Sequence, residues 1–182
     1  MHRVLAALLA ACLLSSAIPA HAQRGRYRDP GTPPEFGIDA AATFTLDPSA
    51  TAISIPAAQV RAGFFASHTV EFEPSVGFVS ANGSGSRFTE LQFGLGVLYH
   101  FARSRLETQP YLRPFTALQF VSTTGDDNST SPVAGIGFGA KFPFGSRFAF
   151  RPELNYAHIW SDGDADDLDQ IRLLVGISVY AR

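Results

Sequence analysis

The sequence predicts an all-β fold, an eight-stranded antiparallel up-and-down transmembrane β-barrel, and three observations predict it. Apolar and polar residues alternate with a period of two in several separate segments, which is the spacing of half-buried strands. The polar positions of these segments hold much Gly, Ser and Thr, in a chain of 182 residues with 16 Gly and a single Lys. The connections between the segments are alternately short and longer, which is typical of an up-and-down barrel.

Five segments show the alternation most clearly. In residues 91–101 the odd positions are all apolar, and the opposite face carries Gln92, Gly94 and Gly96. Successive residues of a strand point to opposite faces, so each such segment has one apolar and one polar face. The five predicted strands are Val70–Phe78, Leu91–Phe101, Ala134–Phe142, Phe148–Tyr156 and Ile171–Val179.

Three weaker segments bring the predicted strands to eight. They are Phe36–Leu46, about Ala57–Ala66, and Tyr111–Val121. Between the strands, the short connections Ser67–Thr69, Ala102–Thr108 and Gly145–Ser146 alternate with Asp47–Pro56, Ala81–Arg87, Ser122–Pro132 and Ser161–Leu168, which are mostly longer and rich in Gly, Ser, Asn and Asp. We therefore expect short turns at one rim of the barrel and longer loops at the other.

The first 22 residues are typical of a secretory signal peptide. One positive charge precedes the apolar run Val4–Leu14, and small residues follow as far as Ala22. The run is too short to cross a membrane as a helix, which takes about 20 residues. We expect cleavage after Ala22, a flexible periplasmic segment over residues 23–34 and the barrel over residues 35–182. A lipoprotein signal, after whose removal Cys12 would be the lipidated N-terminus, is the alternative.

The sense of the alternation decides between two kinds of barrel. A soluble periplasmic ligand-binding barrel places its apolar face inside, whereas a membrane barrel turns that face to lipid. The polar face here carries little charge, which favours the membrane barrel, and its charges balance, as a closed interior requires. We expect an interior charge network of the acids Asp39, Glu71, Glu73, Glu90 and Glu153 with the bases Arg61, Arg113, Lys141, Arg151 and Arg172, in which Glu153 pairs with Arg151 or Arg172.

Aromatic residues gather toward both ends of the predicted strands. Two such girdles are expected where a barrel meets the two membrane interfaces. The residues Tyr99, Phe101, Phe142, Phe144, Phe148 and Phe150 flank the short turns, whereas Phe44, Phe78, Phe120, Tyr156 and Trp160 approach the longer loops. This distribution also favours lipid on the outside of the barrel.

These features together resemble the outer-membrane β-barrel domain of the OmpA/OmpX-like superfamily. The resemblance covers residues 35–182 and rests on the signal, the eight amphipathic strands and the segments GIGFGAKF (135–142), FGLGVLYHF (93–101) and LLVGISVY (173–180). It implies a bacterial outer-membrane location, contact with outer-membrane lipid and lipopolysaccharide, insertion by the barrel-assembly machinery, and a monomer. Such proteins usually end in an aromatic residue, whereas this sequence ends Tyr180-Ala181-Arg182.

The segment PELNYAHIWSDG (152–163) suggests an enzyme as the alternative, because it resembles the outer-membrane lipid A deacylases. The resemblance implies His158 as base, Ser161 as nucleophile and Asp166 or Asp169 as the orienting acid. In that family the His and Ser are two residues apart and share one face of the strand. Here they are three apart and point to opposite faces unless a bulge intervenes. The spacing therefore favours a protein without catalytic residues.

The last connection is rich in Asp, and Asp162, Asp164 and Asp166 are weak candidates for a metal site. The EF-hand pattern fails, because Asp167 stands where Gly is needed and Leu173 where Glu is needed. We therefore expect no metal and no cofactor. A net charge of −2 and a pI of about 6.2 argue against a nucleic-acid partner. The sequence thus favours a small non-enzymatic outer-membrane barrel with a plugged interior and a structural, adhesive or surface-interaction role.

Overall fold

The computed structural model describes residues 33–46, 58–83, 86–102, 107–123, 128–161 and 166–181. The expected signal peptide, its cleavage after Ala22, the alternative at Cys12 and most of the segment 23–34 lie outside these residues, as do Asp162 and Asp164. Within the described residues, no helix has the length and apolar character needed to cross a membrane.

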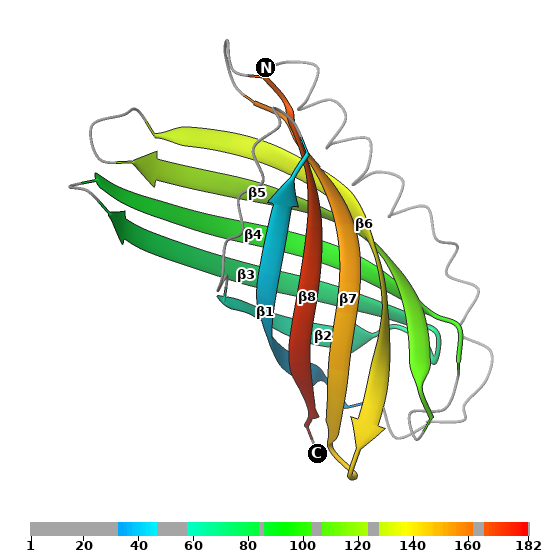
Figure 1. Cartoon of the computed structure of the whole chain (residues 1–182). Coiled ribbons are helices and arrows are strands. Elements are labelled where there is room, and N and C mark those ends of the chain that lie inside the picture. Colours follow the sequence, from blue (N-terminus) through cyan, green and yellow to red (C-terminus); the bar gives the residue numbers. More distant parts are fainter. Residues whose placement is uncertain are drawn as a thin grey trace. The chain divides into compact units, whose positions relative to one another are not determined.

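Eight antiparallel strands close into a barrel in sequence order, as Figure 1 shows. The last strand closes it by pairing with the first along the whole length of the first, from Glu35↔Tyr180 to Thr45↔Gln170. This confirms the predicted fold class. The strands are β1 (Glu35–Thr45), β2 (Ala58–Phe65), β3 (Val70–Gly83), β4 (Ser86–His100), β5 (Gln109–Thr123), β6 (Ser129–Phe144), β7 (Phe148–Ile159) and β8 (Leu168–Tyr180).

The barrel has two distinct ends. At the turn end, Glu35 of β1 lies between Gly63 of β2 and Tyr180 of β8, and the backbone N–H of Ala181 donates to the carbonyl of Pro34 (2.9 Å). The turn from β6 to β7 lies at the same end, where Gly145 adopts a positive φ of 72° that suits a residue without a Cβ. The opposite end, toward which β1 and β3 run, is the loop end (Figure 1).

The six strands from β3 to β8 reach further toward the loop end than the sequence predicts, most clearly β3 to β6. The prediction of connections over 81–87 and 122–132 is wrong in part, because β3 continues to Gly83, β4 begins at Ser86, β5 continues to Thr123 and β6 begins at Ser129. These extensions are mostly polar and lack the apolar alternation that marks a strand. They are strands nevertheless because the ladder between β3 and β4 continues to Gly83↔Ser86 and satisfies the backbone hydrogen-bonding groups.

The barrel is apolar outside and polar inside. On the outer face, Phe138 is 60% exposed and Ile38 is 58% exposed, whereas Glu73 on the inner face is fully buried. A water-soluble barrel shows the opposite arrangement, so the alternative of a soluble ligand-binding barrel is wrong. The outer face is apolar because these strands carry their Phe, Leu, Ile and Val at the outward positions of the pleat.

Aromatic side chains line the outer face near both ends. At the turn end Tyr99 and Phe101 meet edge to face with ring centroids 5.4 Å apart, and Phe144 stacks on Phe148 at 5.7 Å. All six aromatic residues predicted near the short turns are exposed on the outer face. Of those predicted near the longer loops, Phe78, Phe120, Tyr156 and Trp160 are exposed and Phe44 is half-buried.

Glycines on the inner face make room for the buried charged side chains. A Cβ added at Gly176 of β8 would overlap the Asp39 carboxylate, and one at Gly63 of β2 would overlap that of Glu71. A Cβ at Gly77 of β3 would meet nothing closer than 3.6 Å. Packing of the buried carboxylates therefore requires glycine at positions 176 and 63, whereas position 77 has room for a side chain.

Gly176→Ala is expected to destabilise the barrel, because the added methyl group displaces a buried carboxylate from its ion pair. Overpacking of this kind costs about 1–3 kcal/mol. The matched control is Gly77→Ala, which adds the same methyl group where the space is open. The comparison is made by urea titration of the folded protein in lipid vesicles. Equal stability of the two variants would show that the inner face accommodates a methyl group at position 176 as readily as at position 77.

Candidate functional site

The structure places all ten residues of the predicted charge network on the inner wall of the barrel. Eight of them are buried, whereas Glu90 and Arg172 lie half-buried nearer the loop end. Three further residues join the network: Glu35, His100 and Tyr111, each fully buried. The interior thus has two parts, a dense ionic cluster toward the turn end and a more open region toward the loop end.

The part of the cluster nearest the turn end is centred on Lys141 of β6. Its ammonium donates to Oε2 of Glu35 on β1 (2.5 Å) and to Oε2 of Glu71 on β3 (2.7 Å). The same oxygen of Glu71 is 2.8 Å from Nε2 of His100 on β4. These contacts join β1, β3, β4 and β6, and so tie strands from different sides of the barrel together.

Arg61 of β2 connects this group to the β1 carboxylates. Its Nη1 donates to Oε1 of Glu35 (2.7 Å) and its Nε donates to Oδ2 of Asp39 (2.9 Å). Its Nη2 donates to the hydroxyl oxygen of Ser178 on β8 (2.8 Å). A guanidinium has five N–H donors in a fixed fork, so one Arg can satisfy several acceptors that converge from neighbouring strands.

The middle of the cluster is built on Glu73 and Glu153. Arg151 of β7 ion-pairs with both carboxylates, at 2.8 Å from Nη2 to Oε2 of Glu153 and by a short contact to Glu73. Arg113 of β5 donates to Oε1 of Glu153 (2.5 Å), and the hydroxyl of Tyr111 donates to its Oε2 (2.7 Å). The predicted pairing of Glu153 with Arg151 is present in the structure. Its pairing with Arg172 is not among the ion pairs of the described residues.

Three carboxylates of the cluster approach one another closely enough to suggest a metal site. One oxygen each of Glu35, Glu71 and Glu73 lies within 4.8 Å of the others. The ammonium of Lys141 and the guanidinium groups of Arg61 and Arg151 already contact these carboxylates. The negative charge is thus compensated by protein cations, and the arrangement is that of an ionic plug.

Sequence reasoning left Glu35, His100 and Tyr111 out of the predicted network. The alternation along the strands could have indicated two of them, because Glu35 shares a face with Asp39, and Tyr111 shares a face with Arg113. His100 stands on the predicted polar face of its strand, but nothing local indicates its partner, which lies 29 residues away in the chain.

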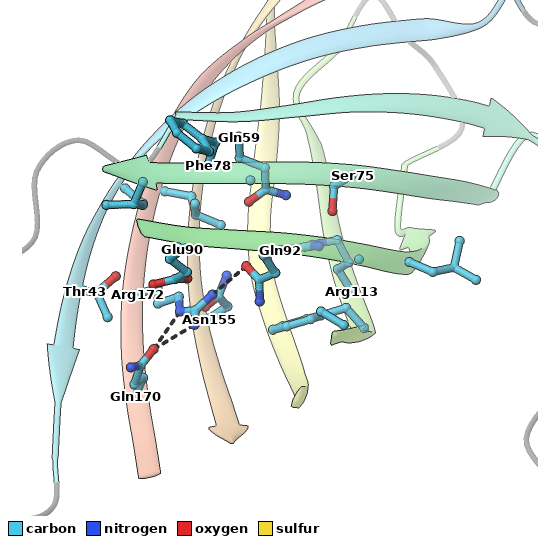
Figure 2. A pocket seen from close by; sticks show the side chains of 18 of the residues that line it. Thr43, Gln59, Ser75, Phe78, Glu90, Gln92, Arg113, Asn155, Gln170 and Arg172 are labelled. Atoms are coloured by element: carbon cyan, nitrogen blue, oxygen red, sulfur yellow. Dashed lines mark hydrogen bonds between the residues drawn. The ribbon is translucent and has the colours of Figure 1, made fainter. Parts of the chain in front are cut away.

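A cavity of about 290 Å³ lies above the plug, toward the loop end (Figure 2). Polar residues of β1 to β4 and of β8 line it, among them Thr43, Gln59, Gln92 and Arg172. An apolar group on β5 to β7, comprising Phe115, Val133, Ala157 and Ile159, packs in the same half of the barrel interior. The lumen therefore holds the ionic cluster toward the turn end and the cavity toward the loop end.

Two of the predicted enzyme residues, His158 and Asp169, lie on the outer face at the loop end. The ring of His158 on β7 contacts Asp169 on β8, its partner in the strand register, with Nδ1 2.8 Å from Oδ1. The hydroxyl of Tyr156 donates to the same oxygen (2.6 Å), and the ring of Trp160 packs edge to face on His158 at 4.7 Å. An acid and a base are therefore brought together here, beside an interfacial Trp.

Ser161 does not complete that arrangement. Its hydroxyl donates to the backbone carbonyl of Asp166 (2.7 Å), and its backbone N–H donates to Oδ1 of Asp167 (3.0 Å). A Ser hydroxyl has one proton to donate, so the Ser161 hydroxyl, which donates to Asp166, does not also donate to His158. Trp160 occupies the position two residues from His158 on the same face. Asp166 is exposed and contributes only its carbonyl oxygen to these contacts.

Comparison with known proteins gives a family and several similar folds. A model of the outer membrane protein beta-barrel domain matches residues 8–179 of the chain. A search of curated proteins finds no match. Among solved structures, Neisserial surface protein A (NspA) is similar with a TM-score of 0.69 and 18% sequence identity, over 81% of this chain and 97% of that chain.

Two further structures are similar over comparable lengths. The outer membrane enzyme PagL gives a TM-score of 0.51 at 17% identity, over 77% of this chain and 97% of that chain. Ail, the attachment invasion locus protein of Yersinia pestis, gives 0.50 at 11% identity, over 82% and 98%. At these identities the likeness concerns the eight-stranded fold alone.

Proposed function

Because the chain belongs to the outer membrane protein beta-barrel domain family, we propose that it is a small non-enzymatic barrel that is closed to ion flow. Its proposed role, at the bacterial surface, is structural, adhesive or in interaction with other molecules. The observation that carries the proposal is the buried ionic plug. Outer-membrane lipid and lipopolysaccharide would surround the apolar wall, and the barrel-assembly machinery would insert it as a monomer.

The plug supports a closed lumen because its ion pairs cross the barrel. Arg151 on β7 reaches Glu73 on β3, and Lys141 on β6 reaches Glu35 on β1. An eight-stranded barrel has an interior just wide enough for side chains, so linked side chains at this level leave little room for a hydrated ion. With its lumen blocked at the level of the plug, such a barrel offers its loops and its rim to other molecules.

The wild-type protein is expected to show little or no ion conductance in planar lipid bilayers. The double variant Glu73→Ala with Arg151→Ala removes one anion and one cation together, so it thins the plug and keeps the charge balance; we expect a higher conductance from it. Glu107→Gln, at an exposed site outside the lumen, serves as the control and should match the wild type. A steady, porin-sized conductance from the wild type would contradict the closed barrel.

A lipid-ester hydrolase is the second candidate, and the contact between His158 and Asp169 favours it. An acid that orients a base on the outer face, near the membrane interface, supplies two of the three members of a hydrolytic triad. The missing member is a nucleophile within hydrogen-bond reach of the base. Ser161 donates elsewhere, so we rank this function second.

The purified protein in detergent micelles is expected to release no fatty acid from lipid A or from phospholipid above the level of the His158→Ala variant. The reason is that no serine hydroxyl among the described residues donates to His158. Release is measured by mass spectrometry. Hydrolysis by the wild type that is lost in both His158→Ala and Ser161→Ala would establish the hydrolase instead.

A further inference from the structure

We propose that the cavity at the loop end binds a small zwitterion of the amino-acid type, with its carboxylate held by Arg172 and its ammonium by Glu90. This goes beyond the proposed structural role, which needs no ligand. Figure 2 shows the two side chains extending into the same cavity from β8 and β4.

Arg172 enters the cavity with unused hydrogen-bonding capacity. Its Nε and Nη2 donate to Oε1 of Gln170 (3.0 and 2.7 Å), and its Nη1 donates to Oε1 of Gln92 (3.2 Å) on the opposite wall. Three of the five guanidinium N–H groups are thereby used, all on neutral amides. Among the described residues, no carboxylate forms an ion pair with Arg172 within 4.0 Å.

Glu90 is the matching anion. It lines the same cavity from β4. In the described part of the chain, no Lys, Arg or His lies within ion-pair distance of it. Three charged side chains therefore line the cavity: Arg113, which is paired with Glu153, and Arg172 and Glu90, which form no direct ion pair in the described part of the chain. Arg172 and Glu90 attract each other across the cavity without a direct contact, and a ligand with both charges would pair with each of them directly.

Asn155 adds an unpaired acceptor to the cavity wall. It is 4% exposed, its Nδ2 donates to Oε1 of Glu153 (3.3 Å), and its Oδ1 has no hydrogen-bond partner. Buried polar atoms are nearly always paired, so this oxygen calls for a donor in the cavity. An ammonium group has three donors and can serve Glu90 and an amide oxygen together.

The size and the remaining wall limit the ligand. Pockets for small molecules begin at about 300 Å³, and this cavity of about 290 Å³ matches the lower end of that range. Phe115, Ala117 and Leu174 supply an apolar surface on its wall. An amino acid with a small apolar side chain presents the three matching parts: a carboxylate, an ammonium and a hydrocarbon group.

The test compares three probes on the folded protein in detergent micelles by isothermal titration calorimetry. Leucine carries both charges, isovalerate carries the carboxylate alone, and isopentylamine carries the ammonium alone. We expect leucine to bind at least about tenfold more tightly than either single-charge probe. Equal binding of isovalerate or of isopentylamine would overturn the zwitterion assignment. If no probe bound at millimolar concentrations, the cavity would take up water alone and the proposal would be overturned.

Variants locate the site. Arg172→Gln and Glu90→Gln are each expected to weaken leucine binding by about tenfold or more, and the matched control Glu107→Gln should leave it unchanged. Folding of each variant is checked first by the shift of its gel mobility on heating. Unchanged leucine binding in folded Arg172→Gln would place the ligand elsewhere. If a variant does not fold, the three-probe comparison on the wild type still decides the proposal.

Discussion

Phe138→Arg is expected to impair folding of the barrel into lipid bilayers. Phe138 lies on the outer face of β6, 60% exposed, between Leu112 on β5 and Leu154 on β7. It is four residues from the aromatic Phe142 near the turn end, so its side chain faces the hydrocarbon interior. An Arg on the lipid face of a barrel costs about 2–4 kcal/mol at the midplane. The measurement is a urea titration in lipid vesicles, with gel mobility as the readout of folding.

The matched control for this variant is Thr130→Arg, on the same strand and the same face. Thr130 is exposed and pairs with Phe120 near the loop end, where the same side chain costs only about 0–1 kcal/mol. A depth-dependent cost is specific to a barrel that stands in a membrane. If the two variants lost equal stability, the outer wall would not be facing lipid.

Glu153→Gln is expected to lower the free energy of unfolding more than any other conservative exchange of one residue in the plug. The carboxylate of Glu153 accepts hydrogen bonds from Arg113, Arg151, Tyr111 and Asn155. The amide keeps the shape but removes the negative charge, which leaves two buried guanidinium groups with less compensation. Removing one partner of a buried ion pair costs about 3–5 kcal/mol.

Glu107→Gln is the control for the same chemical exchange at an exposed position. Surface substitutions of this kind change stability by about 0.5 kcal/mol or less. Both proteins are unfolded by urea from vesicles of the same lipid. A Glu153→Gln variant as stable as Glu107→Gln would mean that the plug contributes nothing to stability, and the closed lumen would lose its structural basis.

Much of the fold was accessible from the sequence because alternation along a strand is a local property. Residues 134–142 carry their Phe and Ile on one face and Gly on the other. In the structure each side chain points to the face that the alternation predicts. The same rule placed Asp39, Arg151 and Glu153 inside. It failed at 81–87 and 122–132, where polar strand extensions depend on a partner strand and carry no pattern of their own.

The candidate sites were accessible only in part. The spacing of His158 and Ser161 predicted that they face apart, and the structure commits the Ser161 hydroxyl to Asp166. The contact of His158 with Asp169 follows from the register of β7 on β8, which no single strand contains. Nothing in the sequence indicated the cavity, because a cavity forms where side chains from different strands leave space between them in the lumen.

The sequence by itself thus determined the number of strands, the outer and inner faces, and the lumen position of ten charged residues, because these depend on local periodicity. Only the tertiary structure decided which charges pair. Lys141 pairs with Glu35 and Glu71, and Glu153 pairs with Arg113, whereas Arg172 and Glu90 form no direct ion pair among the described residues. The physical reason is that these partners come from strands distant in the chain. Barrel closure and register set their height and distance across the lumen.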